Sequence, residues 1–340
     1  MAATVRLTTA EIEALALLAL TRGGATAANA APLARAVAEA ECCGIASHGL
    51  MYLPTYVEHL GCGKVNGRAE PVLEQPKPGV VTVDAATGFA HPAIVLGEGP
   101  LIVAARSQGI ACLAIKNSYN CGVLGHHTER IARSGVVALG FTNAPASIAP
   151  IGGKRPVVGT NPFSLAAPDA SGEAVLVIDQ SASVVAKSEV MKRARAGEPI
   201  PEGWVLDAEG NPTVDAEAGL KGSMAPSGGY KGVGVGLMVE LFAAAMTGAE
   251  LGIDAAPFSG TTGGPPRTGQ FFVAIDPGTT SGGNFENRLA RLVEAIRAQE
   301  GARIPGSRRR AARERAAVEG IAVDAALLAR IDAMVNSGDT

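Results

Sequence analysis

Between residues 80 and 141, apolar runs of strand type alternate with stretches of helical period, and this alternation limits the possible folds more than any other feature of the sequence. The runs VVTVDA (80–85), IACLAI (110–115) and VVALGF (136–141) predict strands, and residues 92–107 and 123–134 predict the helices between them. Such an alternation is typical of a sheet covered by helices. We therefore expect an α/β protein.

The rest of the sequence extends this pattern at both ends. Thr8 and Glu11 have the spacing of a helix capping box, and an alanine-rich helix is expected over 26–43. Residues 143–163 are rich in Pro, Gly, Asn and Ser and predict a long loop, which in a compact domain is usually functional. Further predicted elements are strands at 174–179 and 270–276, a helix at 231–248 and a helical tail from 283.

Charge and cysteine content exclude several classes of protein. The 29 basic and 32 acidic residues give a net charge of −3, so nucleic acid is not an expected partner. No apolar run approaches the roughly 20 residues of a membrane-spanning helix, and the first residues lack the layout of an export signal, so we expect a cytoplasmic protein without a membrane partner. The five cysteines lack CxxC spacing and are expected to be reduced thiols.

With 340 residues, two compact units are expected.

The common nucleotide-binding motifs are absent. No GxGxxG follows the first strand, and GVGVG at 232–236 lacks the third glycine at the required offset, so close helix packing is its simpler explanation. GxxxxGK[ST] is missing as well, which leaves triphosphate hydrolysis without support.

His48 is the strongest candidate for chemistry. Ser47 and Gly49 flank it with small residues that leave room for a ligand beside a group able to exchange protons near neutral pH. Asp179, at the carboxyl end of a predicted strand, is a suitable partner that would fix the imidazole tautomer. The simpler interpretations are a structural histidine and an aspartate that caps a turn.

The other histidines do not predict a metal site. Adjacent residues on a helix point about 100° apart, so His126 and His127 cannot chelate one ion together. His59 and His91 have no partner at a useful spacing and are expected at the surface or in packing.

Several motifs, in consistent order from about residue 8 to 335, together resemble the malate/lactate dehydrogenase family of the non-Rossmann type. This family includes ureidoglycolate and sulfolactate dehydrogenases, diketogulonate reductase and the piperideine- and pyrroline-carboxylate reductases. The motifs are SHG (47–49), KNSYNCGVLGHH (116–127), APIGGKRPVVGTNPFSLAAP (149–168), VLVID (175–179), GGYKG (228–232) and IPGSRR (304–309).

The resemblance implies a fold, a domain division and an assembly. It implies a nicotinamide-binding α/β domain with a mixed sheet and without the glycine motif, over residues 76–284. It also implies a helical domain built from residues 1–75 and 285–340. Family members are homodimers with the active site near the subunit interface, so a homodimer acting on a small-molecule substrate is expected.

The same resemblance implies roles for individual residues. His48 would donate a proton to the substrate, with Asp179 beside it, and Ser47, Tyr52 and His127 would face the substrate. The cofactor would be bound by Asn120, Cys121, Gly122, Val123, Leu124, Thr160, Asp179, Gln180, Ser181, Lys231, Pro305, Gly306, Arg308 and Arg309. Because guanidinium groups suit a 2′-phosphate, the two arginines favour NADPH over NADH, although a solvated basic helix start would look the same.

Two positions and one short stretch depart from the family pattern. Asn120 stands where a histidine is common, so no acid/base role remains there and only hydrogen bonding is possible; His48, or else His126 or His127, would carry the proton transfer. Tyr52 stands where an arginine commonly binds the substrate carboxylate, and the usual DMAT is replaced by DQSA at 179–182. These changes bear on the substrate more than on the fold.

We therefore predict an NAD(P)H-dependent reductase of a 2-oxo or cyclic 2-imino acid, with hydride transfer to C2 and His48 as proton donor. One alternative is an NAD-dependent 2-hydroxy-acid dehydrogenase. The other is a homologue that binds cofactor but has lost turnover through the changes at Asn120 and Tyr52.

Overall fold

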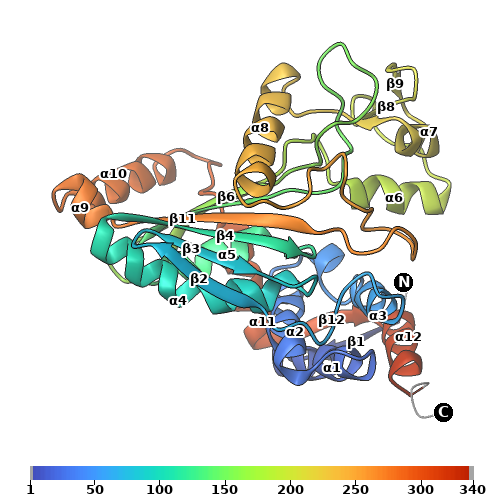
Figure 1. The fold of residues 1–340 in the computed structure, drawn as a ribbon, viewed down its shortest axis with the longest axis horizontal. Coiled ribbons are helices and arrows are strands. Elements are labelled where there is room, and N and C mark those ends of the chain that lie inside the picture. Colours follow the sequence, from blue (N-terminus) through green and yellow to red (C-terminus); the bar gives the residue numbers. More distant parts are fainter. Residues whose placement is uncertain (1–2, 337–340) are drawn as a thin grey trace.

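The computed structural model describes residues 3–336, and its centre is a seven-stranded sheet with strand order β2-β3-β4-β11-β5-β6-β7 (Figure 1). The strands are β2 (Val72–Lys77), β3 (Val80–Asp84), β4 (Ile110–Ser118), β5 (Val137–Thr142), β6 (Phe163–Pro168), β7 (Ala174–Gln180) and β11 (Thr268–Ile275). Within it β3 and β4 are parallel, whereas the other neighbouring pairs are antiparallel. The sheet is therefore mixed, as predicted.

Helices cover both faces of this sheet. On one face α4 (Ala90–Gln108) and α5 (Leu124–Ala132) enclose the largest apolar core, in which Leu113 and Phe272 are completely buried. On the other face α8 (Tyr230–Glu240) and its π-helical continuation η2 (Leu241–Ala245) pack against Phe141 and Phe271. Further along that face, α9 (Pro277–Ser281) precedes α10 (Phe285–Arg297), whose Leu289 packs with residues of β6 and β7.

A second body is formed by helices from both ends of the chain (Figure 1). It contains α1 (Thr9–Arg22), α2 (Ala27–Cys42), the 3₁₀ turn η1 (Ala46–His48), α3 (Leu53–Gly61), α11 (Ser307–Glu319) and α12 (Ala325–Asn336). Strand β1 (Thr4–Leu7) pairs antiparallel with β12 (Ile321–Asp324), which joins the two ends directly. Thr8 and Glu11 form the predicted capping box at the start of α1.

A smaller lobe extends from the end of β7. It consists of α6 (Lys187–Ala196), α7 (Ala216–Lys221) and the short strands β8 (Val205–Leu206), β9 (Pro212–Thr213) and β10 (Ser223–Met224). Its core contains Val190, Ile200 and Val205 and continues to Val233 of α8.

The predicted alternation over 80–141 is confirmed, but the place of β11 in the sheet and the strand β6 were not predicted. Strand β11, more than a hundred residues downstream, lies between β4 and β5 and separates strands that follow each other in the chain. Phe163, the last residue of the predicted loop 143–163, is the first residue of β6. The division at residues 75 and 285 stays a prediction: α12 packs with the N-terminal helices, whereas α10 packs on the sheet.

Candidate active site

His48 lies at the end of a tight turn that follows α2. The hydroxyl of Ser47 lies 3.0 Å from its Nδ1 and can fix the orientation of the ring. Glu41, in the last turn of α2, accepts a hydrogen bond of 2.7 Å from the Leu50 amide and so holds the turn from below. A Cβ at Gly49 would lie 2.2 Å from the Glu41 carboxylate, so a side chain there would displace Glu41 from its hydrogen bond with Leu50.

Asp179 reaches the same place from the end of β7. Its Oδ2 accepts hydrogen bonds from the Gly125 amide at 3.1 Å and from Nη2 of Arg309 at 2.8 Å. A Cβ on Gly125 would lie 2.5 Å from Nη1 of Arg309 and 2.7 Å from Oδ2 of Asp179. The absence of a side chain at Gly125 therefore lets β7, α5 and α11 meet.

The charges around His48 act on its protonation. Burial lowers its pKa below the ordinary value, the carboxylate of Asp179 raises it, and the guanidinium of Arg309 lowers it again. A histidine, a carboxylate and a guanidinium from three distant parts of the sequence thus form one interacting group, which we call the catalytic cluster.

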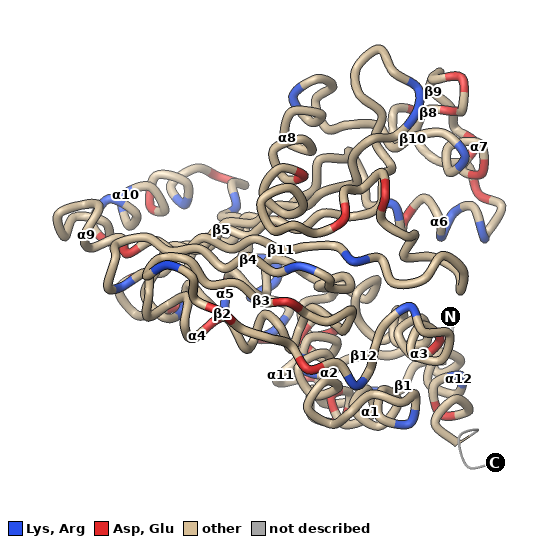
Figure 2. The backbone as a smooth tube through the Cα atoms, viewed as in Figure 1, with Lys and Arg blue, Asp and Glu red and all other residues tan. Residues whose placement is uncertain are grey.

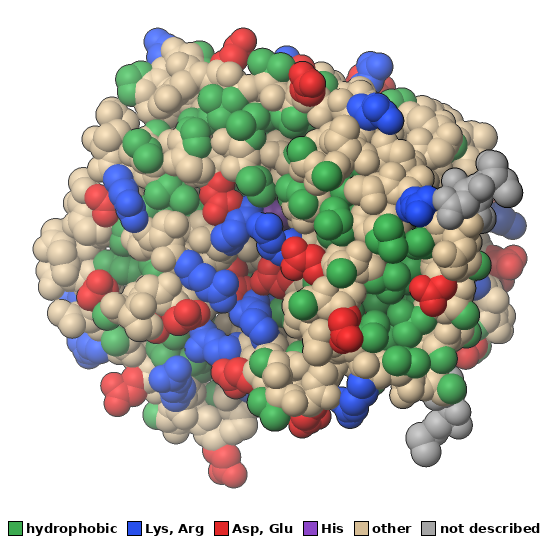
Figure 3. All heavy atoms as spheres, turned by 90° about the horizontal axis from the view of Figure 1, so that it is seen from below, with side chains coloured by type: hydrophobic (Ala, Val, Ile, Leu, Met, Phe, Trp, Pro, Cys, Tyr) green, Lys and Arg blue, Asp and Glu red, His purple; other side chains and the backbone are tan. Residues whose placement is uncertain are grey.

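Arg309 is placed by the way α11 docks on β7. Gly306, with φ +92°, ends the preceding turn in a left-handed conformation, and a Cβ there would lie 3.0 Å from Val177. The carbonyl of Pro305 accepts a hydrogen bond of 3.1 Å from the Val177 amide. The two predicted cofactor arginines therefore separate: Arg309 turns inward to Asp179, whereas Arg308 is exposed. Figure 3 shows Lys and Arg side chains gathered around a hollow on one face of the molecule.

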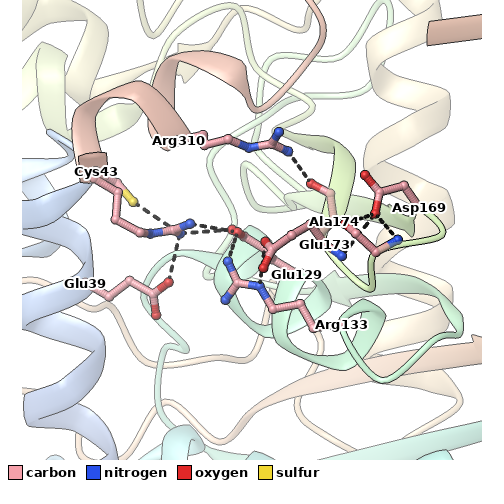
Figure 4. A network of polar contacts seen from close by, with 10 residues as sticks. Glu39, Cys43, Glu129, Arg133, Asp169, Glu173, Ala174 and Arg310 are labelled. Atoms are coloured by element: carbon pink, nitrogen blue, oxygen red, sulfur yellow. Dashed lines mark hydrogen bonds and ion pairs between the residues drawn. The ribbon is translucent and has the colours of Figure 1, made fainter. Parts of the chain in front are cut away.

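A partly buried ionic network fixes α11 against the rest of the protein (Figure 4). Arg313 donates to both carboxylate oxygens of Glu129, at 3.0 and 3.2 Å, and to Glu39 at 3.1 Å. Glu129 also pairs with Arg133 at 2.7 Å. Since Glu39 lies on α2 and Glu129 on α5, one guanidinium joins three helices next to the catalytic cluster.

Tyr52 and Asn120 lie in a neutral hydrogen-bonded group. Nδ2 of Asn120 donates to the Tyr52 hydroxyl at 3.4 Å, and the Tyr56 hydroxyl donates to Oδ1 of Asn120 at 3.1 Å. Tyr52 also donates to the Phe258 carbonyl at 3.4 Å. Burial raises the pKa of Tyr52, so its hydroxyl stays uncharged at neutral pH. Position 52 itself therefore contributes no positive charge to its surroundings.

The two adjacent histidines of α5 are buried, and neither ring nitrogen of His126 has a hydrogen-bond partner among residues 3–336. His126 and His127 are buried, and burial lowers the pKa of His126 well below its usual range and that of His127 to about 3. Nε2 of His127 lies 2.8 Å from the Cys121 carbonyl and its ring packs near His91 and Phe272. The structure therefore does not bring His127 to the catalytic cluster.

The predicted cofactor loop Asn120–Leu124 offers mainly backbone to a ligand. The side chains of Cys121, Val123 and Leu124 are buried, and burial raises the pKa of the Cys121 thiol to about 12. Gly122 turns the chain with φ +64°, and its amide donates to Oδ1 of Asn120.

A pocket of about 380 Å³ collects another part of the predicted cofactor residues. Gln180, Ser181 and Lys231 line it, together with Phe163, Ser183 and Ser227. The Thr160 carbonyl accepts a hydrogen bond of 2.8 Å from the Ala182 amide and so fixes the wall of the pocket. Gly232 and Gly236 pack tightly against neighbouring segments, which explains two glycines of GVGVG by packing.

This pocket and the catalytic cluster lie on different sides of β7. Successive side chains of a strand point to opposite faces, so Asp179 faces α5 and α11 while Gln180 faces α8. The predicted cofactor residues are thus divided between two places that meet at the end of one strand.

Sequence reasoning missed Gly125, Tyr56 and the Arg313–Glu129 pair. Gly125 stood inside a quoted motif, but only the close approach of Asp179 and Arg309 reveals its role. Among residues 3–336 there is no group of three or more His, Cys, Asp or Glu side chains arranged to hold a metal ion. None of the helices in this range is long and apolar enough to cross a membrane.

Comparison with known proteins shows which family has a sequence and a fold similar to those of this chain. Residues 7–332 match the sequence model of a family described as malate/L-lactate dehydrogenase. A (2R)-3-sulfolactate dehydrogenase (NADP(+)) from Chromohalobacter salexigens is 46% identical over 89% of this chain and 90% of its own length. A Δ1-pyrroline-2-carboxylate reductase from Ancylobacter novellus is 39% identical over 97% of both chains. The crystal structure of a Δ1-piperideine-2-carboxylate reductase from Pseudomonas syringae superposes with a TM-score of 0.91 at 35% identity, covering 97% of this chain and all of the other.

Proposed function

The chain belongs to the malate/L-lactate dehydrogenase family, and on this premise we propose that it is an NADPH-dependent reductase of 2-oxo acids and cyclic 2-imino acids. Relatives of both kinds support the proposal, since one is a dehydrogenase of a 2-hydroxy acid with NADP(+) and others are reductases of cyclic 2-imino acids. Both reactions change the same bond, between C2 and an oxygen or a nitrogen.

The residues present fit a dinucleotide cofactor. Lys231 lies in the first turn of α8, so its charge, the helix N-terminus and the serine hydroxyls of the pocket suit phosphate groups. We propose that Thr160, Gln180, Ser181 and Lys231 hold one part of the cofactor. We propose that the backbone of Asn120–Leu124, Asp179 and the Pro305–Gly306 turn hold the rest, with the exposed Arg308 available to a 2′-phosphate. When bound, NADPH supplies the hydride that C2 receives.

His48 is the proposed proton donor. Ser47 holds Nδ1, which leaves Nε2 to face a substrate oxygen or nitrogen and deliver the proton. Asp179 favours the protonated ring, and Asn120, fixed by Tyr56, offers a neutral hydrogen bond. Proton donation of this kind contributes roughly 100- to 10,000-fold to the rate.

One observation carries this proposal: His48, Asp179 and Arg309, from three distant segments, interact in one cluster at the end of β7. The test is NADPH oxidation by the purified protein against pyruvate, phenylpyruvate, Δ1-pyrroline-2-carboxylate and Δ1-piperideine-2-carboxylate, each also measured with NADH. We expect turnover of at least one of these compounds, with NADPH preferred. Bound NADPH without any oxidation across the panel would contradict the proposal and favour a homologue without turnover.

A second candidate is a 2-hydroxy-acid dehydrogenase that works in the oxidative direction. The observation that favours it is the 46% identity to the sulfolactate dehydrogenase. Initial rates in both directions with NADP(+) and NAD(+) distinguish the two candidates, and a preference for NADH of about tenfold or more would remove Arg308 from the phosphate role.

We also propose a cytoplasmic homodimer. All five cysteines are free, which suits a reducing compartment. Leu237, Met238 and Leu241 of α8 and η2 are exposed, as is Met246 directly after them, and Figure 2 shows few charged residues on this helix. An apolar face of this kind is suited to a second copy of the chain. Light scattering of the purified protein, compared with a Leu237→Lys, Leu241→Lys variant, tests this assembly.

A further inference from the structure

A loop that begins and ends at the sheet reaches across to the helical body. Residues 246–267 connect η2 to β11, and the Glu250 amide donates to the Arg267 carbonyl at 3.0 Å, which closes the base of the loop. The tip, residues 257–260, contacts α3 and the segment that follows it, and it is part of the orange loop in Figure 1. We call residues 257–260 the strap. Because the base and the tip of the loop contact different bodies, the strap links the two.

Two buried side chains of the helical body bind the backbone of the strap. Lys64 donates to the carbonyls of Pro257 and Ser259, at 2.6 and 3.2 Å. Nε2 of His59 lies 3.0 Å from the Gly260 carbonyl, so this nitrogen carries the ring proton. Burial and the charge of Lys64 lower the pKa of His59, so the ring is neutral at neutral pH. A buried ammonium group requires acceptors, and Lys64 finds them on both sides of residue 258.

The strap continues through Phe258 into the group that holds Asn120. The Phe258 carbonyl accepts a hydrogen bond from the Tyr52 hydroxyl, and the same hydroxyl accepts one from Nδ2 of Asn120, both at 3.4 Å. The ring of Phe258 packs on Tyr119, with ring centroids 5.5 Å apart. Oδ1 of Asn120 is held separately, by the Tyr56 hydroxyl at 3.1 Å. The two ends of this amide are therefore fixed by different parts of the protein, and Nδ2 is the end that depends on the strap.

Aromatic side chains gather at this place although the chain has few of them. Of the four tyrosines in the sequence, Tyr52, Tyr56 and Tyr119 lie here, and Phe258 joins them from the strap. Tyr52 and Asn120 remain partly exposed, whereas Tyr56 and Tyr119 are buried behind them. The partly exposed pair is thus the part that a substrate can reach, and the buried tyrosines and the strap support it.

We propose that Lys64 is a positioning residue of the active site: it seats the strap, and the strap, through the hydroxyl of Tyr52, orients the second N–H of Asn120 toward the substrate. This inference rests on the proposed function, in which Asn120 offers the substrate a neutral hydrogen bond. An amide nitrogen carries two N–H groups, and Tyr52 accepts one of them, so the position of Tyr52 determines where the other points. Hydrogen bonds weaken steeply when they are misaligned. An unseated strap would therefore weaken this contact without removing any group that touches the substrate.

The first test is a double-mutant cycle with a substrate that the wild type reduces. Lys64→Met keeps the length of the side chain and removes its donors. It should raise KM about tenfold and change kcat and NADPH affinity by less than about threefold, because Tyr56 still holds Asn120. In a Tyr52→Phe background the link from the strap to Asn120 is already broken, so the same substitution should change KM by less than about twofold. Equal effects in the two backgrounds would overturn the inference, since a merely structural lysine would act alike in both. Lys77→Met, at an exposed lysine, is the control.

The second test measures the seating of the strap without turnover. Chymotrypsin can cleave after Phe258 when the strap opens and the ring leaves Tyr119, so the fragments, identified by mass, should appear at least about tenfold faster in Lys64→Met than in the wild type or Lys77→Met. Lys64→Gln, which retains one donor group, should lie between them and takes the place of Lys64→Met if that variant does not fold. Equal cleavage rates in all these proteins would overturn the inference. If the wild type reduces no compound of the panel, the proposed function fails, whereas the cleavage rates still decide whether Lys64 seats the strap.

Discussion

Replacing Arg313 with leucine tests whether the ionic network that holds α11 also holds the active site. Arg313 makes three hydrogen bonds to carboxylates, two to Glu129 and one to Glu39, and the side chain of Glu129 is only 9% exposed. Removing one partner of a buried ion pair typically costs about 3–5 kcal/mol, because the other charge is left without compensation.

The expected cost here lies at the lower end of that range. Glu129 keeps its contact with Arg133 at 2.7 Å, and Glu39 is partly exposed to solvent. We therefore expect Arg313→Leu to lower the free energy of unfolding by about 3 kcal/mol. Arg309 lies one turn earlier on α11, so its placement should loosen and KM should rise more than kcat falls.

The assay is urea unfolding at pH 7.5, followed by circular dichroism, together with steady-state kinetics. Arg315→Leu is the matched control, since Arg315 is exposed on the same helix and should change stability by less than about 0.5 kcal/mol. A loss below about 1 kcal/mol in Arg313→Leu, or an unchanged KM in a clearly destabilised variant, would show that the network does not position the site.

Three further predictions concern the cluster and the buried histidines. Gly125→Ala should lower the free energy of unfolding by about 1–3 kcal/mol and remove most of the activity, since its Cβ would displace Asp179 and Arg309. The control is Gly99→Ala, because nothing lies within 4 Å of a Cβ at that position. Equal behaviour of the two variants would contradict the steric argument. Because reduction needs protonated His48, the rate should fall as pH rises through the pKa of that ring. In pH–rate profiles, Asp179→Asn should move the midpoint of this fall to lower pH and Arg309→Gln should move it to higher pH. Shifts of opposite sign would refute the assignment. His91, His126 and His127 have lowered pKa values, so their neutral forms stabilise the fold above pH ~6.5, and this stability is lost as pH falls. Urea unfolding should therefore show lower stability at pH 5 than at pH 6.5, with a contribution of about 2 kcal/mol from His127, whose pKa lies at about 3. Flat stability over this range would contradict the burial of these histidines as neutral groups.

Much of the fold followed from patterns that are local in the sequence. Apolar periodicity located the elements of the 80–141 segment, and the Thr8–Glu11 box located a helix start, because both depend on neighbouring residues. The insertion of β11 between β4 and β5 and the pairing of β1 with β12 depend on contacts between distant segments. No local pattern specifies such contacts.

The candidate site divides in the same way. His48 and Asp179 were identified by residue type and by position at the ends of elements, and the structure places them within electrostatic reach of each other. The inward turn of Arg309 and the outward turn of Arg308 depend on how α11 docks on β7. Gly125 depends on the space left between two side chains from other elements, which spacing along the chain cannot reveal.

The most direct test of the account is the kinetics of His48→Ala with NADPH and a substrate that the wild type reduces. If the ring of His48 delivers the proton, kcat should fall by at least about 100-fold, while the dissociation constant of NADPH, measured by its fluorescence, stays within about threefold. A variant that retains ordinary turnover, or one that loses NADPH binding instead, would contradict the assignment of His48 as the proton donor.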